Sequence, residues 1–494
     1  MTSSKSIAII GGGITGVTAA WKLSKYDSNL TIHLFDQGRR GVGGRTSSRS
    51  VVSTATGTGG DDDDDDDDPG DPGEEDCEEM LRFDHGCQFF RADTSQFREI
   101  VTGEWRPYVR EWKGHFYKSN KTTSSSSSSS EREFFGMPST PPFYVGLDGM
   151  QSLTKNILDH VDKNISSESE SSPSLRVFTG TRVANLERDP SSQKWKLHGT
   201  SGTAAYHDTS EKVAQQLNNT QLLGEGESGY DAVILTDVSS SFGKWHRASA
   251  GVPEHFAKKV RERVGARVPL FSAMVAFDGG TGIPFDAASF DDDPVVWFAA
   301  RSNSKPGMEG GKKECWTIVS TPEYAMAKIK ETPMQDPKTN EFIPQSDDYL
   351  TSVPGPDLCN AFKRSITNRD GILGENALES LPEVVHVDAQ RWGSALPCHR
   401  HLRSDDSATT RRIISGVTYD AGRFPLAPTK EEGGQADVGG CGSGGNGSFL
   451  VDEGMMLLQA GDMVSNHTPG LESAALSGYY AAGYLHEKLH SCTS

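Results

Sequence analysis

The chain has 494 residues and a formal net charge of −19, with 34% hydrophobic and 24% charged residues. No apolar run approaches the ~20 residues of a membrane-spanning helix. Seven scattered cysteines without a Cys-x-x-Cys pair indicate neither a zinc site nor a disulfide framework. Fourteen acidic and no basic residues lie within 51–79, so the rest of the chain carries only −5 and has no basic patch for a nucleic acid.

The first 36 residues follow the order strand, glycine turn, helix, strand and acid. A β-branched apolar run at 6–10 leads into the turn Gly-Gly-Gly-Ile-Thr-Gly at 11–16, and a helical pattern continues over 17–25. A second apolar run at 31–35 ends on Asp36. This order predicts a Rossmann-type α/β domain with a dinucleotide at the start of the first helix.

The glycines and the acid of this unit have separate expected roles. Gly11 allows the sharp turn, Gly13 lets the backbone approach a pyrophosphate, and Gly16 lets the helix pack closely on the strands. Asp36 lies twenty positions after Gly16, where a carboxylate can accept hydrogen bonds from ribose hydroxyls. FAD and NAD both fit, because each contains an adenosine ribose and a pyrophosphate.

A second glycine turn at 37–49 carries four arginines. Arg45 or Arg49 could pair with the same pyrophosphate from the other side; the alternative is a flexible, basic surface loop. Four stretches of low complexity or polar composition then interrupt the chain, and we expect them to be largely disordered: residues 50–79, 118–133, 199–229 and 402–448.

The middle of the chain reads as strands. Runs at 176–178, 181–186 and 194–197 alternate at period two and predict an antiparallel meander. Residues 231–236 predict a buried strand that returns to the dinucleotide-binding sheet. Residues 243–385 combine a helix near 254–264 with several strand patterns, which predicts a separate α+β unit.

The end of the chain predicts a strand, a loop and a helix. The strand delivers Gly461 and Asp462 to the loop, and the helix begins near Gly470 with a face of small residues. Asp462 could accept from a polyol hydroxyl, and the helix N-terminus could stabilise negative charge on a reduced flavin. FAD has a ribitol chain to hold there and NAD does not. The alternative is a helix docked only for stability.

These stretches together resemble the renalase-like family within the FAD-dependent amine-oxidase-like flavoproteins. They occur in family order at residues 11–36, 41–45, 83–90, 144–150, 297–307, 316–324, 390–392 with 396–397, and 461–462 with the last helix. The resemblance implies non-covalent FAD in a discontinuous Rossmann-type domain, residues 1–95, 140–240 and 385–494. It also implies a second, α+β substrate domain, residues 96–139 and 241–384.

The resemblance implies an oxidase that passes hydride from a reduced NAD(P)H-type or related small metabolite to the flavin and then to oxygen, giving hydrogen peroxide. We expect a cytoplasmic enzyme with a small-molecule substrate and no metal, membrane or nucleic-acid partner. The residues implied near the ring are His85, Gln88, Asn303, Arg391 and Trp392. Those implied to hold the cofactor are Gly11, Gly13, Ile14, Thr15, Gly16, Asp36, Gln37, Gly43, Gly44, Arg45, Asp84, His85, Gly86, Val183, Gly461, Asp462, Leu471, Glu472 and Ala475.

Two other functions stay open. A flavin amine oxidase would need an aromatic cage around a primary amine or polyamine and commonly a lysine near the flavin, and the sequence places neither. A flavin-bound interaction protein would use the acidic and serine-rich inserts as contact segments. Cys441 lies in a glycine-rich loop that superficially resembles a covalent flavin site. Substrate identity is the most open point, because Cys87, Gly393-Ser394 and Met463 depart from the family pattern.

Overall fold

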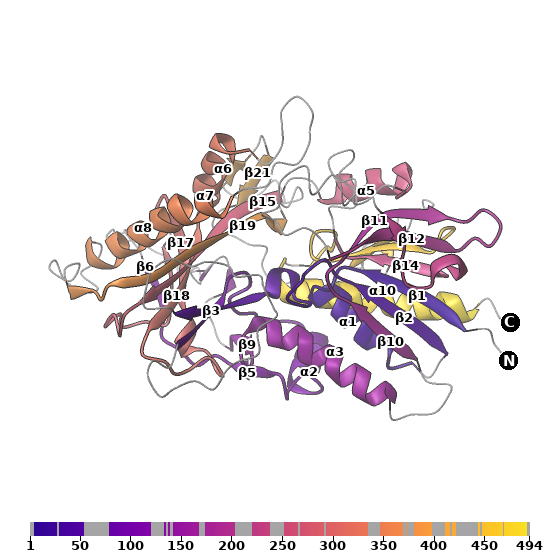
Figure 1. Ribbon diagram of the computed structural model, residues 1–494, viewed down its shortest axis with the longest axis horizontal. Coiled ribbons are helices and arrows are strands. Elements are labelled where there is room, and N and C mark those ends of the chain that lie inside the picture. Colours follow the sequence, from indigo (N-terminus) through magenta and orange to yellow (C-terminus); the bar gives the residue numbers. More distant parts are fainter. Residues whose placement is uncertain are drawn as a thin grey trace, which may run out of the picture.

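A computed structural model of the chain describes residues 4–26, 29–53, 79–119, 133–134, 137–138, 142–166, 173–202, 220–237, 251–264, 267–290, 293–333, 346–368, 373, 380–397, 411–414, 417–420, 443–444, 447–467 and 469–491. Most of the predicted inserts therefore lie outside the described residues. Two sheets dominate the structure, and Figure 1 shows them side by side with the hairpin strand β3 between them.

The first sheet has seven strands in the order β10-β2-β1-β14-β24-β23-β22. The first five strands are parallel, and the last two pairings, β24 with β23 and β23 with β22, are antiparallel. Their bounds are β1 (Lys5–Ile10), β2 (Leu30–Phe35), β10 (Ser174–Phe178), β14 (Ala232–Leu235), β22 (Ser443–Gly444), β23 (Phe449–Asp452) and β24 (Leu457–Ala460). This is the predicted Rossmann-type arrangement, including the return of the strand near residue 232.

Each face of this sheet is covered by a different layer. Helices α1 (Ile14–Leu23), α3 (Met150–Ser166) and α10 (Leu471–Ser491) cover one face, with Ile7 and Ile9 of β1 in their core. Ala8 points to the other face, where the sheet of β11 (Thr181–Arg188), β12 (Trp195–Ser201) and β13 (Gln221–Leu222) packs with helix α5 (Glu254–Val264). The alternation of buried side chains along β1 explains the two cores.

The second sheet has six strands in the order β19-β15-β18-β17-β16-β6. Their bounds are β6 (Phe116–Ser119), β15 (Arg267–Phe277), β16 (Ala287–Phe290), β17 (Val296–Arg301), β18 (Glu314–Ser320) and β19 (Val384–Pro397). Helices α6 (Pro322–Glu331), α7 (Asp347–Ser352) and α8 (Pro354–Asn368) lie along its outer side in Figure 1. This is the predicted α+β unit.

Short elements complete the fold. Helix α2 (Ser95–Thr102) begins at the cap Thr94, whose side chain accepts from the Phe97 N–H. The remaining strands form two-stranded pairs, and the pairs are β3 (Ser48–Ser53) with β4 (Glu79–Asp84), β5 (Val109–Glu111) with β9 (Tyr144–Gly146), β7 (Glu133–Phe134) with β8 (Met137–Pro138), and β20 (Arg411–Ile414) with β21 (Val417–Asp420).

Three predictions need correction. The run at 176–178 is not part of a meander: β10 pairs parallel with β2 at the edge of the large sheet, where one exposed face gives the same alternation. The predicted domain boundary at 385 is wrong, because β19 pairs antiparallel with β15 along its length and therefore belongs to the second sheet. The predicted insert 199–229 contains ordered strand, since β12 runs to Ser201 and β13 pairs with it.

Helices α1 and α10 pack with unusually close backbones. A Cβ atom at Gly478 would lie 2.1 Å from the carbonyl oxygen of Thr15, so only glycine fits there. Gly16 is similar, because its Cβ would lie 2.0 Å from the carbonyl oxygen of Gly11. The predicted packing role of Gly16 and the small-residue face of α10 are thereby explained, and the contact brings the end of the chain beside the first glycine turn.

Replacing Gly478 by alanine should lower the free energy of unfolding by about 2 kcal/mol, because the added methyl group meets backbone that cannot move away. The matched control is Gly483→Ala in the same helix, where the nearest atom is the Tyr26 hydroxyl at 3.4 Å. The control should be neutral or gain up to about 1 kcal/mol of helix propensity. Equal effects in urea unfolding would contradict this packing account.

Candidate functional site

The two glycine turns lie against each other at the start of α1. Gly13 and Gly43 form an isolated parallel bridge, and the Gly43 N–H donates to the Gly12 carbonyl at 3.0 Å. Gly13 caps α1 without a side chain, so no side-chain cap bonds to the first N–H groups of the helix. A Cβ at Gly13 would meet only the Gly43 carbonyl oxygen, at 3.9 Å. The result is a cradle of backbone donors suited to an anion.

Asp36 lies at this cradle, as the sequence predicts. Its carboxylate accepts from the N–H groups of Gly12 at 2.6 Å and Gly38 at 2.7 Å. Burial raises the pKa of this carboxyl, while the two N–H donors oppose the rise. Because a carboxylate offers about four acceptor positions, Asp36 can still accept from ribose hydroxyls.

Gln37 directly follows Asp36, and Val183 lies on β11; both have contacts within the protein. The Gln37 side-chain oxygen accepts from Arg182 Nε at 3.3 Å on β11. Val183 is buried in the core between the large sheet and β11, in the same cluster as Phe35. Both predicted cofactor residues therefore have contacts on β11 or in the core beneath it.

Arg45 and Asp462 form a two-pronged ion pair across the site. Arg45 Nη1 lies 2.9 Å from Asp462 Oδ2, Nη2 contacts the other carboxylate oxygen, and Nη1 also donates to the Ala395 carbonyl at 3.0 Å. The Asp462 side chain is 1% exposed and that of Arg45 is 37% exposed. The predicted partners of these residues were a pyrophosphate and a polyol, but in this structure they bind each other.

The loop that carries Asp462 is held close to the first glycine turn. Gly461 has a φ of 131°, and a Cβ there would lie 3.8 Å from the Thr15 hydroxyl. The Gly461 N–H donates to Ser477 Oγ on α10 at 2.7 Å. The Gly461–Asp462 loop and the start of α1 therefore form adjacent sides of one site.

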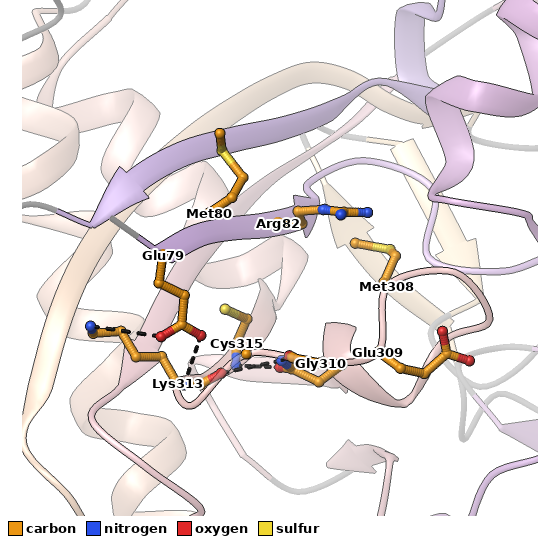
Figure 2. A pocket seen from close by; sticks show the side chains of 10 residues that line it. Glu79, Met80, Arg82, Met308, Glu309, Gly310, Lys313 and Cys315 are labelled. Carbon is orange, nitrogen blue, oxygen red and sulfur yellow. Dashed lines mark hydrogen bonds and ion pairs between the residues drawn. The ribbon is translucent and has the colours of Figure 1, made fainter. Parts of the chain in front are cut away.

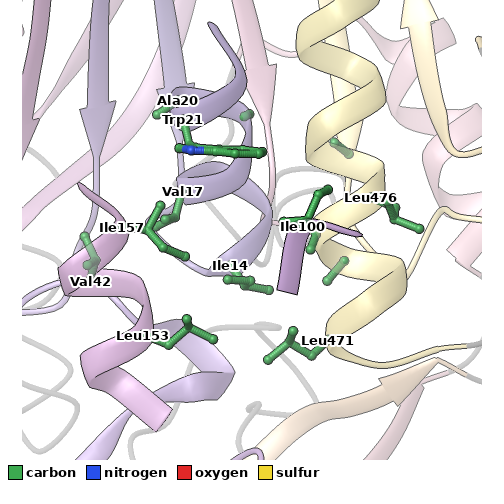
Figure 3. Packing of buried hydrophobic residues seen from close by; sticks show 14 of the residues in the cluster. Ile14, Val17, Ala20, Trp21, Val42, Ile100, Leu153, Ile157, Leu471 and Leu476 are labelled. Carbon is green, nitrogen blue, oxygen red and sulfur yellow. The ribbon is translucent and has the colours of Figure 1, made fainter. Parts of the chain in front are cut away.

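Four other predicted cofactor residues, near the starts of α1 and α10, have packing or hydrogen-bond contacts within the protein. Ile14, Leu471 and Ala475 are buried in the helix core, where Figure 3 shows Ile14 and Leu471 among the packed side chains. Glu472 accepts from the N–H groups of Asp93 and Thr94, both at 2.8 Å, and so joins α10 to the start of α2. Burial raises the pKa of the Glu472 carboxyl.

Residues 84–88 form a further side of the site. The His85 carbonyl accepts from Ser272 Oγ at 2.6 Å and from Trp392 Nε1 at 2.9 Å, and the His85 and Trp392 rings stack with centroids 5.4 Å apart. The Cys87 N–H donates to the Arg45 carbonyl at 2.7 Å. A Cβ at Gly86 would lie 2.2 Å from that same carbonyl oxygen, so glycine is required where the loop meets the second glycine turn.

His85 is buried and neutral. Burial, with the positive charges of Arg49 and Arg40, lowers the pKa of this imidazole to about 3. Among the described residues its Nδ1 has no hydrogen-bond partner. A buried polar atom without a partner is costly, so this nitrogen is suited to bond a group that binds in the site.

Asp84 and Gln88 anchor the loop, together with a residue that the sequence analysis did not single out. Lys305 Nζ lies 2.9 Å from Asp84 Oδ2 and donates to Gln88 Oε1 at 3.2 Å. Lysine is almost never fully buried unless it is paired. The position of Lys305 after an apolar strand was only a weak sign that it is buried, because its partner Asp84 lies more than 200 positions away in the sequence.

Asn303 and Arg391 lie away from these residues. Asn303 Nδ2 donates to the carbonyls of Gly310 and Lys313, and its oxygen accepts from the Cys315 N–H at 2.7 Å. It helps to line the pocket of Figure 2, which Glu79 and Arg82 also line. Arg391 is adjacent to Trp392 on β19, so it points to the opposite face, where it donates to the Thr332 carbonyl at 3.4 Å.

Arg49 is also placed differently from its predicted role. It pairs with Asp388 and donates to Gln390 at 3.4 Å, both on β19. With Trp392 these residues alternate along one face of β19 and contact the β3–β4 hairpin and the loop that follows it. The contact docks the second sheet onto the dinucleotide-binding part. Cys441 lies outside the described residues.

Residues 9–102 match the family model described as "NAD(P)-binding Rossmann-like domain". This confirms the Rossmann-like part of the fold. No curated protein matches the chain. Among the described residues, we find no helix with the length and apolar character to cross a membrane, and no group of three or more potential metal ligands.

Three solved structures align with nearly the whole chain. A reduced UDP-galactopyranose mutase aligns with a TM-score of 0.50 and 9% identity, over 99% of this chain and 96% of that one. A putrescine oxidase bound to putrescine gives 0.49 and 10%, over 98% and 99%. Cyclohexylamine oxidase from Brevibacterium oxydans gives 0.49 and 10%, over 99% and 100%. At 9% identity the mutase shows a shared fold alone.

Replacing Arg45 and replacing Asp462 should lower the stability of the protein by different amounts, because the two side chains differ in exposure. Arg45→Met leaves a buried carboxylate unpaired and should lower the free energy of unfolding by about 3 kcal/mol. Asp462→Asn leaves a partly exposed guanidinium, which water can solvate, and should cost only about 1 kcal/mol. In urea unfolding the double variant should lose less than the sum of the two, and additive losses would contradict the pairing.

His85 should make the protein less stable in mild acid. Between about pH 6.5 and pH 3 the unfolded chain binds a proton at His85 that the folded chain does not, so the free energy of unfolding falls as the pH falls. The loss should be about 2 kcal/mol at pH 5 relative to pH 7.5. His85→Gln should remove that share of the slope, whereas the exposed-site control His115→Gln should keep it. Parallel curves for all three proteins would contradict a buried neutral His85.

Proposed function

We propose that this chain is an FAD-dependent oxidoreductase, and specifically a renalase-like oxidase of a small reduced metabolite. One observation carries the proposal: three glycine-containing segments distant in sequence converge at the carboxyl ends of the parallel strands. The segments are the turn after β1, the turn at 41–45 and the loop at 461–462. Ligands of open α/β sheets bind at this edge.

The residues present suit a flavin dinucleotide. The N–H groups at the start of α1 and the turn at Gly43 would hold a pyrophosphate, and Asp36 would accept from the ribose. These two segments would be enough to hold the adenosine diphosphate part that FAD shares with NAD. Asp462 and Arg45 add polar partners on a third side, where a ribitol chain would lie.

The loop at 84–88 would face the reactive ring. FAD, when bound, would accept hydride from the substrate and pass the electrons to oxygen. His85, which is neutral, would offer the otherwise unpartnered Nδ1 to a bound group without adding positive charge. Trp392 fixes the His85 ring by stacking, and Gly86 lets the loop lie directly against the Arg45 carbonyl.

The substrate side would lie between this loop and the second sheet. Among the predicted catalytic residues, His85, Gln88 and Trp392 take part in the contacts between this loop and the second sheet, whereas Asn303 and Arg391 have other partners. No acid–base pair is assigned, because hydride transfer to a flavin requires orientation and exclusion of water more than proton transfer by a side chain.

The experiment is anaerobic mixing of the purified, FAD-loaded protein with reduced pyridine nucleotides, including their ring isomers, and separately with primary amines and polyamines. We expect the nucleotides to bleach the flavin absorbance and air to restore it with hydrogen peroxide formed. Bleaching only by amines would replace the proposal with an amine oxidase. A protein that binds no FAD would overturn it.

A further inference from the structure

Lys305 and Asp84 form an ion pair that is almost completely shielded from water. Their side chains are 1% and 0% exposed, and the Nζ–Oδ2 distance is 2.9 Å. Lys305 comes from the loop after β17 in the second sheet, whereas Asp84 ends β4 and begins the loop at 84–88. The pair therefore joins the second sheet to the loop at 84–88, which lines the site.

The hydrogen bonds around this pair wrap the loop around the ammonium group. Asp84 Oδ1 accepts from Ser48 Oγ at 2.6 Å and from the Met150 N–H at 2.8 Å. The Gln88 amide nitrogen donates to the carbonyls of Asp84 and Gly86, while its oxygen accepts from Lys305. The ammonium group therefore bonds to Asp84 and Gln88, the first and last residues of the loop.

The other side of the same loop contacts the dinucleotide cradle. The Cys87 N–H and the tight contact at Gly86 both involve the carbonyl of Arg45, whose guanidinium pairs with Asp462. A continuous chain of contacts therefore runs from Lys305 through the loop to Arg45 and Asp462. A shift of the loop would move both His85 and the Arg45 turn.

We propose that Lys305 is a positioning residue that holds the loop at 84–88 in the geometry needed for turnover. The proposal rests on the proposed function. A buried ion pair contributes little net stability, because removing two charges from water costs about as much as their attraction returns. Stability alone therefore does not account for a fully buried lysine in this place, whereas fixing a loop between two domains does.

The test compares Lys305→Met with the double variant Lys305→Met/Asp84→Asn. The single variant leaves the Asp84 carboxylate buried and unpaired, so its urea midpoint should fall clearly below that of the unaltered protein. The double variant is neutral and should recover most of that loss. Its kcat should nevertheless stay about tenfold or more below that of the unaltered protein, because the loop is no longer held.

The matched control is Lys313→Met. Lys313 pairs with Glu79 on the same strand β4, but at 3.9 Å and with both side chains partly exposed. It should keep kcat, KM and the urea midpoint. If the double variant recovers both stability and turnover, Lys305 has only a structural role and the proposal is wrong. Full turnover in the single variant would overturn it as well.

A readout without cofactor separates this inference from the proposed function. The NMR signal of the His85 imidazole in the apoprotein should shift in the double variant and stay unchanged in Lys313→Met. If the unaltered protein binds FAD but the His85 signal of the apoprotein does not shift in the double variant, Lys305 does not have the positioning role. If the unaltered protein binds no FAD, the proposed function fails, while the His85 signal still reports whether Lys305 holds the loop.

Discussion

The close packing of α10 on α1 is the constraint on which the candidate site depends. Because Gly478 allows the helix to approach the backbone at Thr15, the loop that precedes α10 reaches the first glycine turn. Gly461 and Asp462 then lie beside the start of α1, and Asp462 meets Arg45 from the second turn. A single dinucleotide-binding unit is thereby extended by residues from the far end of the chain.

The second sheet completes the site through the loop at 84–88. This loop is bonded to the second sheet at Ser272 and Lys305 and to the second glycine turn at the Arg45 carbonyl. His85 lies where these contacts meet and stays neutral because it is buried near arginine side chains. This arrangement suits the proposed reaction, in which the protein orients a flavin and a substrate. A neutral His85 stacked on Trp392 can bond to a bound group but does not readily exchange a proton with it.

The sequence predicted the parts of this structure that depend on local pattern. The opening unit is local, since strand, turn, helix and acid follow within 36 residues. The edge strand β10 was misassigned, because alternation is the same in a meander and at a sheet edge. Arg391 and Trp392 are neighbours in sequence but lie on opposite faces of β19, and Lys305 is explained only by a distant partner. Such placements depend on tertiary register, which a single sequence does not contain.

The most direct measurement of the central claim is calorimetric titration of the apoprotein with FAD, NAD⁺, ADP-ribose and FMN. We expect FAD to bind more tightly than ADP-ribose and NAD⁺, which fill only the cradle at Asp36, and we expect Asp462→Ala to remove most of this advantage. Equal affinities for FAD and NAD⁺, or an FAD affinity that Asp462→Ala does not change, would contradict the assignment of the third side of the site to a flavin dinucleotide.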